Sequence, residues 1–97
     1  MKQDKAHAEA AIIGYIRQVL FYMFKNKDGI EIIVRYNCAL AVLQYWNNLH
    51  KRNQINLQEL IETALNTHNL IYKSNITAED FSVQLNTIKS IFPQVKL

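Results

Sequence analysis

The sequence predicts an all-α fold: a small four-helix domain that takes up residues 1–97 as a single domain. Glycine and proline are scarce, with two glycines and one proline in 97 residues, which disfavours a fold built on many tight turns. Apolar side chains recur at the three-and-four spacing of a helix face. Several of these segments also begin with an N-cap signal, and this agreement between caps and periods favours helices. The predicted helices span residues 4–25, 29–51, 56–67 and 77–92.

The first predicted helix contains the apolar stretch "IIGYIRQVLFYMF". Gly14, Arg17 and Gln18 form a narrow polar stripe opposite its apolar face, and Phe21 nearly interrupts this stripe. The longest uninterrupted apolar run is six residues, 19–24, whereas a membrane span needs about twenty. The sequence therefore predicts burial in protein and no membrane span.

The segment "KNKDG" that follows has two interpretations. An Asp-Gly pair between β-branched and aromatic residues is a β-hairpin signal for residues 21–34. In the alternative, a helix–helix corner, Asp28 is an N-cap with Glu31 as its capping-box partner. The helical period continues past this point from Ile32 to Trp46, so the pattern favours the corner.

The third and fourth helices show the same start signal. Asn56 precedes Glu59 by three residues, and Thr77 precedes Asp80 by three. The polar segment "NTHNLIYKSN" between the two helices is interpreted as a loop, and Pro93 is expected to end the fourth helix.

The first two helices carry more apolar surface than a small bundle needs. One explanation is a homodimer in which each of these helices buries a second face against another copy of the chain. The alternative is a monomer in which the third and fourth helices wrap across the first two. The sequence favours the homodimer. Its predicted dimer or partner interface consists of Ile12, Ile16, Leu20, Phe24, Tyr45 and Trp46.

No motif specifies a reaction or a ligand. The three histidines, His7, His50 and His68, lie in different segments, and none stands at metal-ligand spacing from Cys38. They are interpreted as surface or helix-end residues, and the lone cysteine as a small buried side chain. The sequence contains no phosphate-binding loop and no dinucleotide motif. We therefore expect no enzyme activity, no cofactor and no metal.

The expected function is a non-enzymatic protein-interaction module that acts as a homo-oligomer, such as a regulator, an inhibitor, an immunity or anti-defence factor, or an assembly subunit. The polar N-terminus shows no signal peptide, so a cytoplasmic location is expected. The alternative is a nucleic-acid-binding regulator, suggested by a net charge of +3. Its candidate polyanion contacts are the basic helix ends Lys25, Lys27, Lys51 and Arg52. A helix-turn-helix is disfavoured because the third connector reads as too long and the third helix is acidic.

Overall fold

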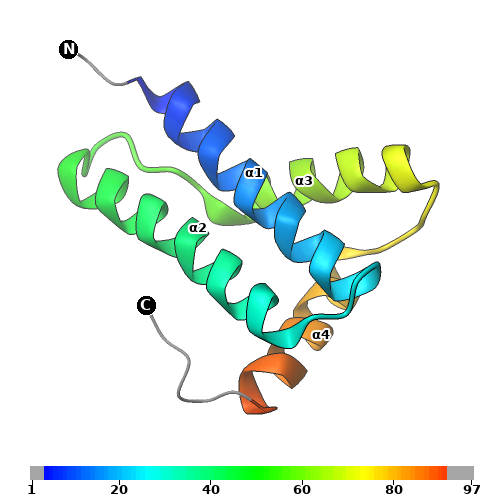
Figure 1. Ribbon diagram of the computed structural model, residues 1–97. Helices are drawn as coiled ribbons and strands as arrows, with labels where there is room; N and C mark the ends of the chain where they lie inside the picture. Colours follow the sequence, from blue (N-terminus) through cyan, green and yellow to red (C-terminus); the bar gives the residue numbers. More distant parts are fainter. Residues whose placement is uncertain (1–3, 92–97) are drawn as a thin grey trace.

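The computed structural model describes residues 4–91, and within this range the chain forms four α-helices and no strand (Figure 1). The all-α prediction is confirmed, and the segment after the first helix is a helix–helix corner instead of a β-hairpin. None of these helices is long and apolar enough to cross a membrane. The helices are α1 (Lys5–Phe24), α2 (Gly29–Leu49), α3 (Leu57–Tyr72) and α4 (Ala78–Ile91).

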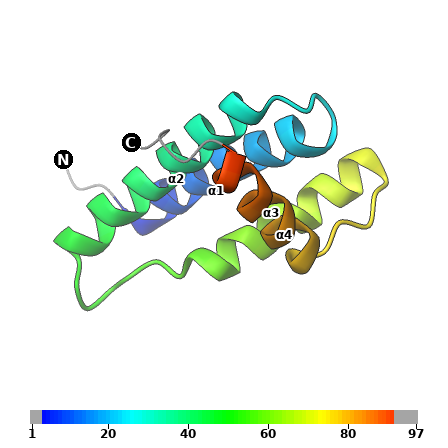
Figure 2. The ribbon, with the colours of Figure 1, turned by 90° about the horizontal axis from the view of Figure 1, so that it is seen from below.

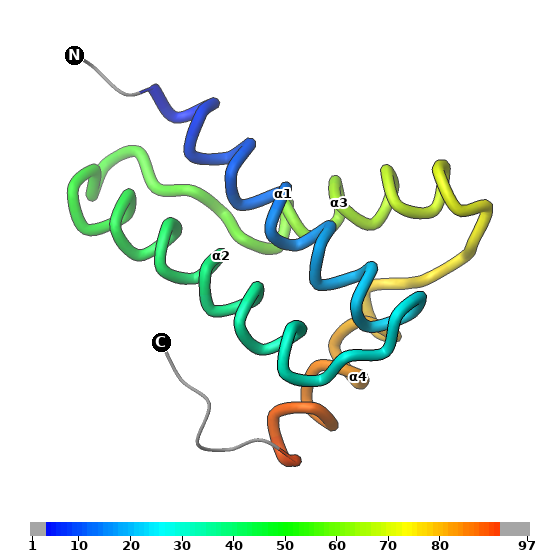
Figure 3. The backbone as a smooth tube through the Cα atoms, in the orientation of Figure 1, coloured from blue at the N-terminus to red at the C-terminus, as the bar shows by residue number. Residues whose placement is uncertain are grey.

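The helices form two layers. In Figures 1 and 3, α1 and α2 lie side by side and run in opposite directions. Figure 2 shows that α3 crosses one face of this pair, and α3 packs against α1. The short α4 packs against α2 and α3. As a result, α1 is covered by α2 on one side and by α3 on another, whereas one side of α2 is covered by no other helix within residues 4–91.

The core is centred on α1. The side chains of Ile12, Ile16 and Leu20 are completely buried within the single chain. This arrangement matches part of the alternative weighed from the sequence, because α3 covers the second apolar face of α1 without a second copy. The remaining buried apolar residues include Val19, Ile32, Ala39, Trp46, Ile61, Ala64, Leu65, Phe81 and Leu85.

The predicted N-caps are in place, but only one forms a reciprocal capping box. Oδ1 of Asp28 accepts a hydrogen bond from the backbone nitrogen of Glu31 at 3.2 Å, while the Glu31 carboxylate turns to Arg35, 3.0 Å away. Thr77 and Asp80 each accept from the other's backbone nitrogen at 3.0 Å. At α3, Oδ1 of Asn56 accepts from the backbone nitrogen of Glu59 at 3.3 Å.

The predicted end of the third helix is wrong. α3 continues to Tyr72 and ends at Lys73, which adopts the left-handed conformation with φ 53° and ψ 49°. Asparagine, threonine and histidine are weak helix formers, which is why this segment reads as a loop. Here the tertiary structure overrides that preference, because His68 is buried instead of lying at the surface. The expected end of the fourth helix at residues 92–93 lies outside the described residues.

Asparagine side chains hold both of the longer connectors. Asn69 in α3 donates from Nδ2 to the carbonyl oxygen of Ile76 at 2.9 Å and accepts from the Ile76 backbone nitrogen at 3.0 Å. The Asn47 side chain in α2 forms the same two hydrogen bonds with the backbone of Ile55, and it accepts from the Ile55 nitrogen at 2.7 Å. These bonds satisfy backbone groups of Ile55 and Ile76, which lie outside the helices and have no helical hydrogen-bond partner. They also fix where α3 and α4 begin.

A candidate binding groove across α1

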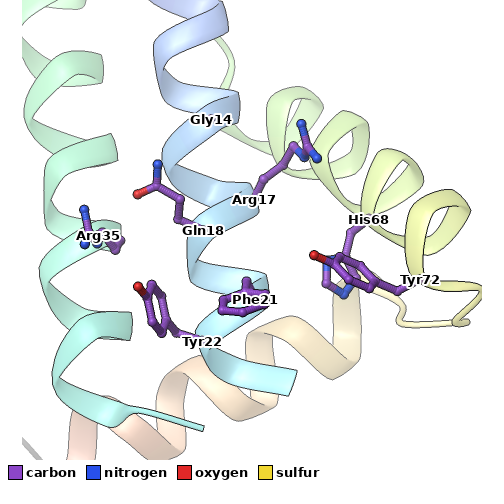
Figure 4. Close-up of a pocket in the computed structure, with 8 residues that line it drawn as sticks. All are labelled: Gly14, Arg17, Gln18, Phe21, Tyr22, Arg35, His68 and Tyr72. Atoms are coloured by element: carbon purple, nitrogen blue, oxygen red, sulfur yellow. The ribbon is translucent and has the colours of Figure 1, made fainter. Parts of the chain in front are cut away.

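An open groove of about 550 Å³ runs across α1 (Figure 4). Its floor is the polar stripe of α1, in which Gly14, Arg17, Gln18 and Phe21 recur at helical spacing. The narrow polar stripe seen in the sequence is therefore the floor of a concave surface, which we call the α1 groove. It is lined by Gly14, Arg17, Gln18, Phe21, Tyr22, Arg35, His68 and Tyr72.

The charge on the α1 groove is positive. Arg17 is exposed, and its guanidinium makes no ion pair within residues 4–91. Arg35 is the only other arginine of the lining, and it is held by Glu31 and lies 5.7 Å from the centre of the Tyr22 ring. The Lys25 ammonium adds positive charge nearby. Arg17 is therefore the charge in the groove that is open to an anionic partner.

A buried histidine forms part of the groove wall. His68 is only 2% exposed, and its Nε2 has no hydrogen-bond partner in the part of the chain that the structure describes. Burial lowers the pKa of His68, and the positive charges of Lys25 and Arg17 lower it further. A neutral imidazole is thus favoured, with one nitrogen able to donate and the other able to accept. A buried polar atom without a partner is costly.

The rim of the groove is apolar. Phe21 is 38% exposed and Tyr72 is 37% exposed. Tyr72 also carries the Lys25 ammonium 5.0 Å from its ring centre. Aromatic side chains beside an arginine are the composition of protein-interface hot spots.

The six predicted interface residues differ in how far the structure exposes them. Ile12, Ile16 and Leu20 lie in the core and offer no surface to a second chain as long as the fold is intact. Trp46 is 5% exposed, and its Nε1 donates to the Asn53 carbonyl oxygen at 2.8 Å. Phe24 is half-buried against the core, and Tyr45 is 65% exposed on α2. Tyr45 is the most exposed of the six.

The predicted basic helix ends lie in two places. Lys25 and Lys27 occupy the corner between α1 and α2, whereas Lys51 and Arg52 follow the opposite end of α2. A helix of 21 residues is about 30 Å long. These side chains therefore form no single patch, and of the four only Lys25 is close to the α1 groove.

Metal-binding geometry is absent from the described range, since no three His, Cys, Asp or Glu side chains there could hold an ion. His7 is exposed, and the His50 ring stacks on Trp46 at 3.8 Å. The thiol of Cys38 is free and half-buried.

Sequence reasoning missed the groove because His68 and Tyr72 had been placed in a loop. The signal that pointed to it was a glycine in mid-helix, followed at helical spacing by Arg17 and Phe21 in a stripe too narrow for a solvated face.

No protein-family model matches this sequence, and no curated protein or solved structure matches it significantly. The functional argument therefore depends on the groove itself.

Proposed function

We propose that this chain is a non-enzymatic protein-binding module whose α1 groove takes an acidic segment of a partner protein. The observation that carries the proposal is the combination of a free guanidinium, that of Arg17, with a buried and unpartnered histidine nitrogen in one open groove. Such a module would act as a regulator, an inhibitor or an assembly subunit.

Charge favours an acidic ligand. Arg17 presents a planar set of donors that matches a carboxylate, and it has no competing acid among residues 4–91. Lys25 and Arg17 both raise the positive potential at His68, as its lowered pKa indicates. An Asp or Glu side chain in the groove would meet this positive potential.

The apolar rim favours protein over nucleic acid. Phe21 and Tyr72 together offer a surface for an aliphatic or aromatic side chain next to the acidic one. A nucleic-acid strand needs a series of cations along its backbone. Here Arg35 is already paired with Glu31, and the remaining basic helix end is at the far side of α2.

Selection of peptides from a random displayed library tests the proposal with a defined probe. We expect the selected peptides to be enriched in Asp or Glu beside an apolar residue. Arg17→Glu should reduce their binding at least about tenfold, or ~1.4 kcal/mol. Arg52→Glu is the matched control, because it makes the same change of charge at an exposed position outside the groove.

Two results would contradict the proposal. One is peptide binding that Arg17→Glu and Arg52→Glu weaken equally, since this would show a general charge effect. The other is salt-sensitive retention of DNA or RNA with a Kd at or below about 1 µM, which would favour the nucleic-acid alternative.

A further inference from the structure

We propose that two copies of this chain associate through the uncovered side of α2. This second surface is independent of the α1 groove, and we call it the outer face of α2. It surrounds a shallow hollow of about 350 Å³. The hollow is lined by Asn37, Leu40, Ala41, Gln44, Tyr45 and Asn48.

Within residues 4–91, no other helix covers this face. α2 packs chiefly against α1. The side of α2 that is turned away from α1 lies at an edge of the described helices (Figure 3). Tyr45 is 65% exposed, and Leu49, one turn further along the helix, is 60% exposed. Ala41, Gln44 and Asn48 are exposed as well. Large apolar side chains at such exposure in the middle and at the end of a helix are typical of an interaction surface.

The charge pattern favours a second copy as the occupant. No Asp, Glu, Lys or Arg occurs from residue 37 to residue 49, although 20% of the whole chain is charged. Exposed helix faces normally carry charges, which keep identical molecules apart. A neutral face meets its own copy without repulsion. The α1 groove is different, because pairing it with itself would bring Arg17 of one copy towards the positive groove of the other.

The side chains of this face suit a two-fold contact. The amides of Asn37, Gln44 and Asn48 both donate and accept, so they are complementary to themselves. Ala41 lies between them and is the smallest residue of the lining, which allows two helices to approach closely. A two-fold axis near Ala41 places Leu40 and Tyr45 of each copy beside that contact. Closed two-fold dimers are also the commonest form of self-association.

Sedimentation of the full chain over a concentration series tests the dimer. One helix face is at the small end of interface sizes, so the series should reach about 100 µM. We expect a species of twice 11.3 kDa for the wild type. Ala41→Glu should abolish it, because two like charges then meet at the axis. Ala10→Glu, at an exposed alanine of α1, should leave the dimer intact.

Each other outcome counts against the proposal. A wild-type chain that stays at 11.3 kDa throughout the series overturns it. A dimer that survives Ala41→Glu overturns the choice of face, and so does one that Ala10→Glu dissolves equally. Thermal unfolding of both variants, followed by circular dichroism, shows that they are folded.

Cross-linking provides a readout that does not depend on disruption. Packed helix axes lie 8–10 Å apart, which leaves facing Cα atoms roughly 3–5 Å from each other, near the span of a disulfide. In a Cys38→Ala background, Ala41→Cys should therefore form a covalent dimer on oxidation. Glu62→Cys, exposed on α3, should not. Equal cross-linking of the two variants, or none at Ala41→Cys, would refute the contact.

Discussion

The centre of the Tyr72 ring lies 4.6 Å from the centre of the His68 ring, and the two ring planes are tilted by 42°. The two residues stand one turn apart at the end of α3. Tyr72 therefore shields an imidazole that would otherwise face water at a helix end. The same contact builds the wall of the α1 groove, so the stability of the fold and the shape of the groove depend on one pair of rings.

Stability should fall in mild acid because of His68. Its pKa is lowered in the folded chain by burial first and by Lys25 and Arg17 second, from an ordinary value of 6.5. The unfolded chain therefore binds more protons as the pH falls below about 6.5, and the free energy of unfolding decreases. Above that pH, the contribution of neutral His68 to the free energy of unfolding is fully present. Urea unfolding between about pH 5 and pH 8 measures it.

His68→Phe keeps an aromatic ring at this position and removes the titration. We expect the free energy of unfolding of this variant to change less over the same pH range than that of the wild type. A His68→Phe variant as sensitive to acid as the wild type would show that other groups cause the effect.

Gly14→Ala should stabilise the protein. Gly14 lies inside α1, and a Cβ added there meets nothing within 4 Å in the described chain. Alanine in a helix interior is favoured over glycine by about 0.5–1 kcal/mol. Denaturant unfolding should therefore give a free energy of unfolding higher by that amount. A decrease would mean that a neighbouring group occupies the space that is open here.

Asn69→Leu should destabilise the protein by about 1–3 kcal/mol, because two backbone groups of Ile76 lose their partner. Asn66 is exposed one turn earlier on α3, so Asn66→Leu should change the free energy of unfolding by no more than about 0.5 kcal/mol. Equal effects of the two substitutions would mean that the amide of Asn69 does not hold the connector.

Local signals were sufficient to predict the helices. The N-caps at Asp28, Asn56 and Thr77 depend on residues three positions apart, and the hydrogen bonds confirm all three starts. The end of α3 was not predictable in this way. Its last turn is stabilised by burial of His68 and by the hydrogen bond that the backbone nitrogen of Ile76 donates to the Asn69 side chain, and neither leaves a local pattern.

The α1 groove required the tertiary structure. Arg17 and Phe21 were visible as an unusual stripe, but their neighbours His68 and Arg35 come from other helices. The exposure of the predicted interface residues also depended on the tertiary structure. The excess apolar surface of α1 was real, and the sequence could not show that α3 covers it while the outer face of α2 stays open.

The most direct test of the central claim is calorimetric titration of a selected acidic peptide into the wild type, Gly14→Ala and Gly14→Leu. Alanine leaves the floor of the groove nearly flat, whereas leucine fills the open space above it. We predict wild-type affinity for Gly14→Ala and a loss of at least about tenfold, or ~1.4 kcal/mol, for Gly14→Leu. Undiminished binding by a folded Gly14→Leu variant would contradict the claim that the α1 groove is the binding site.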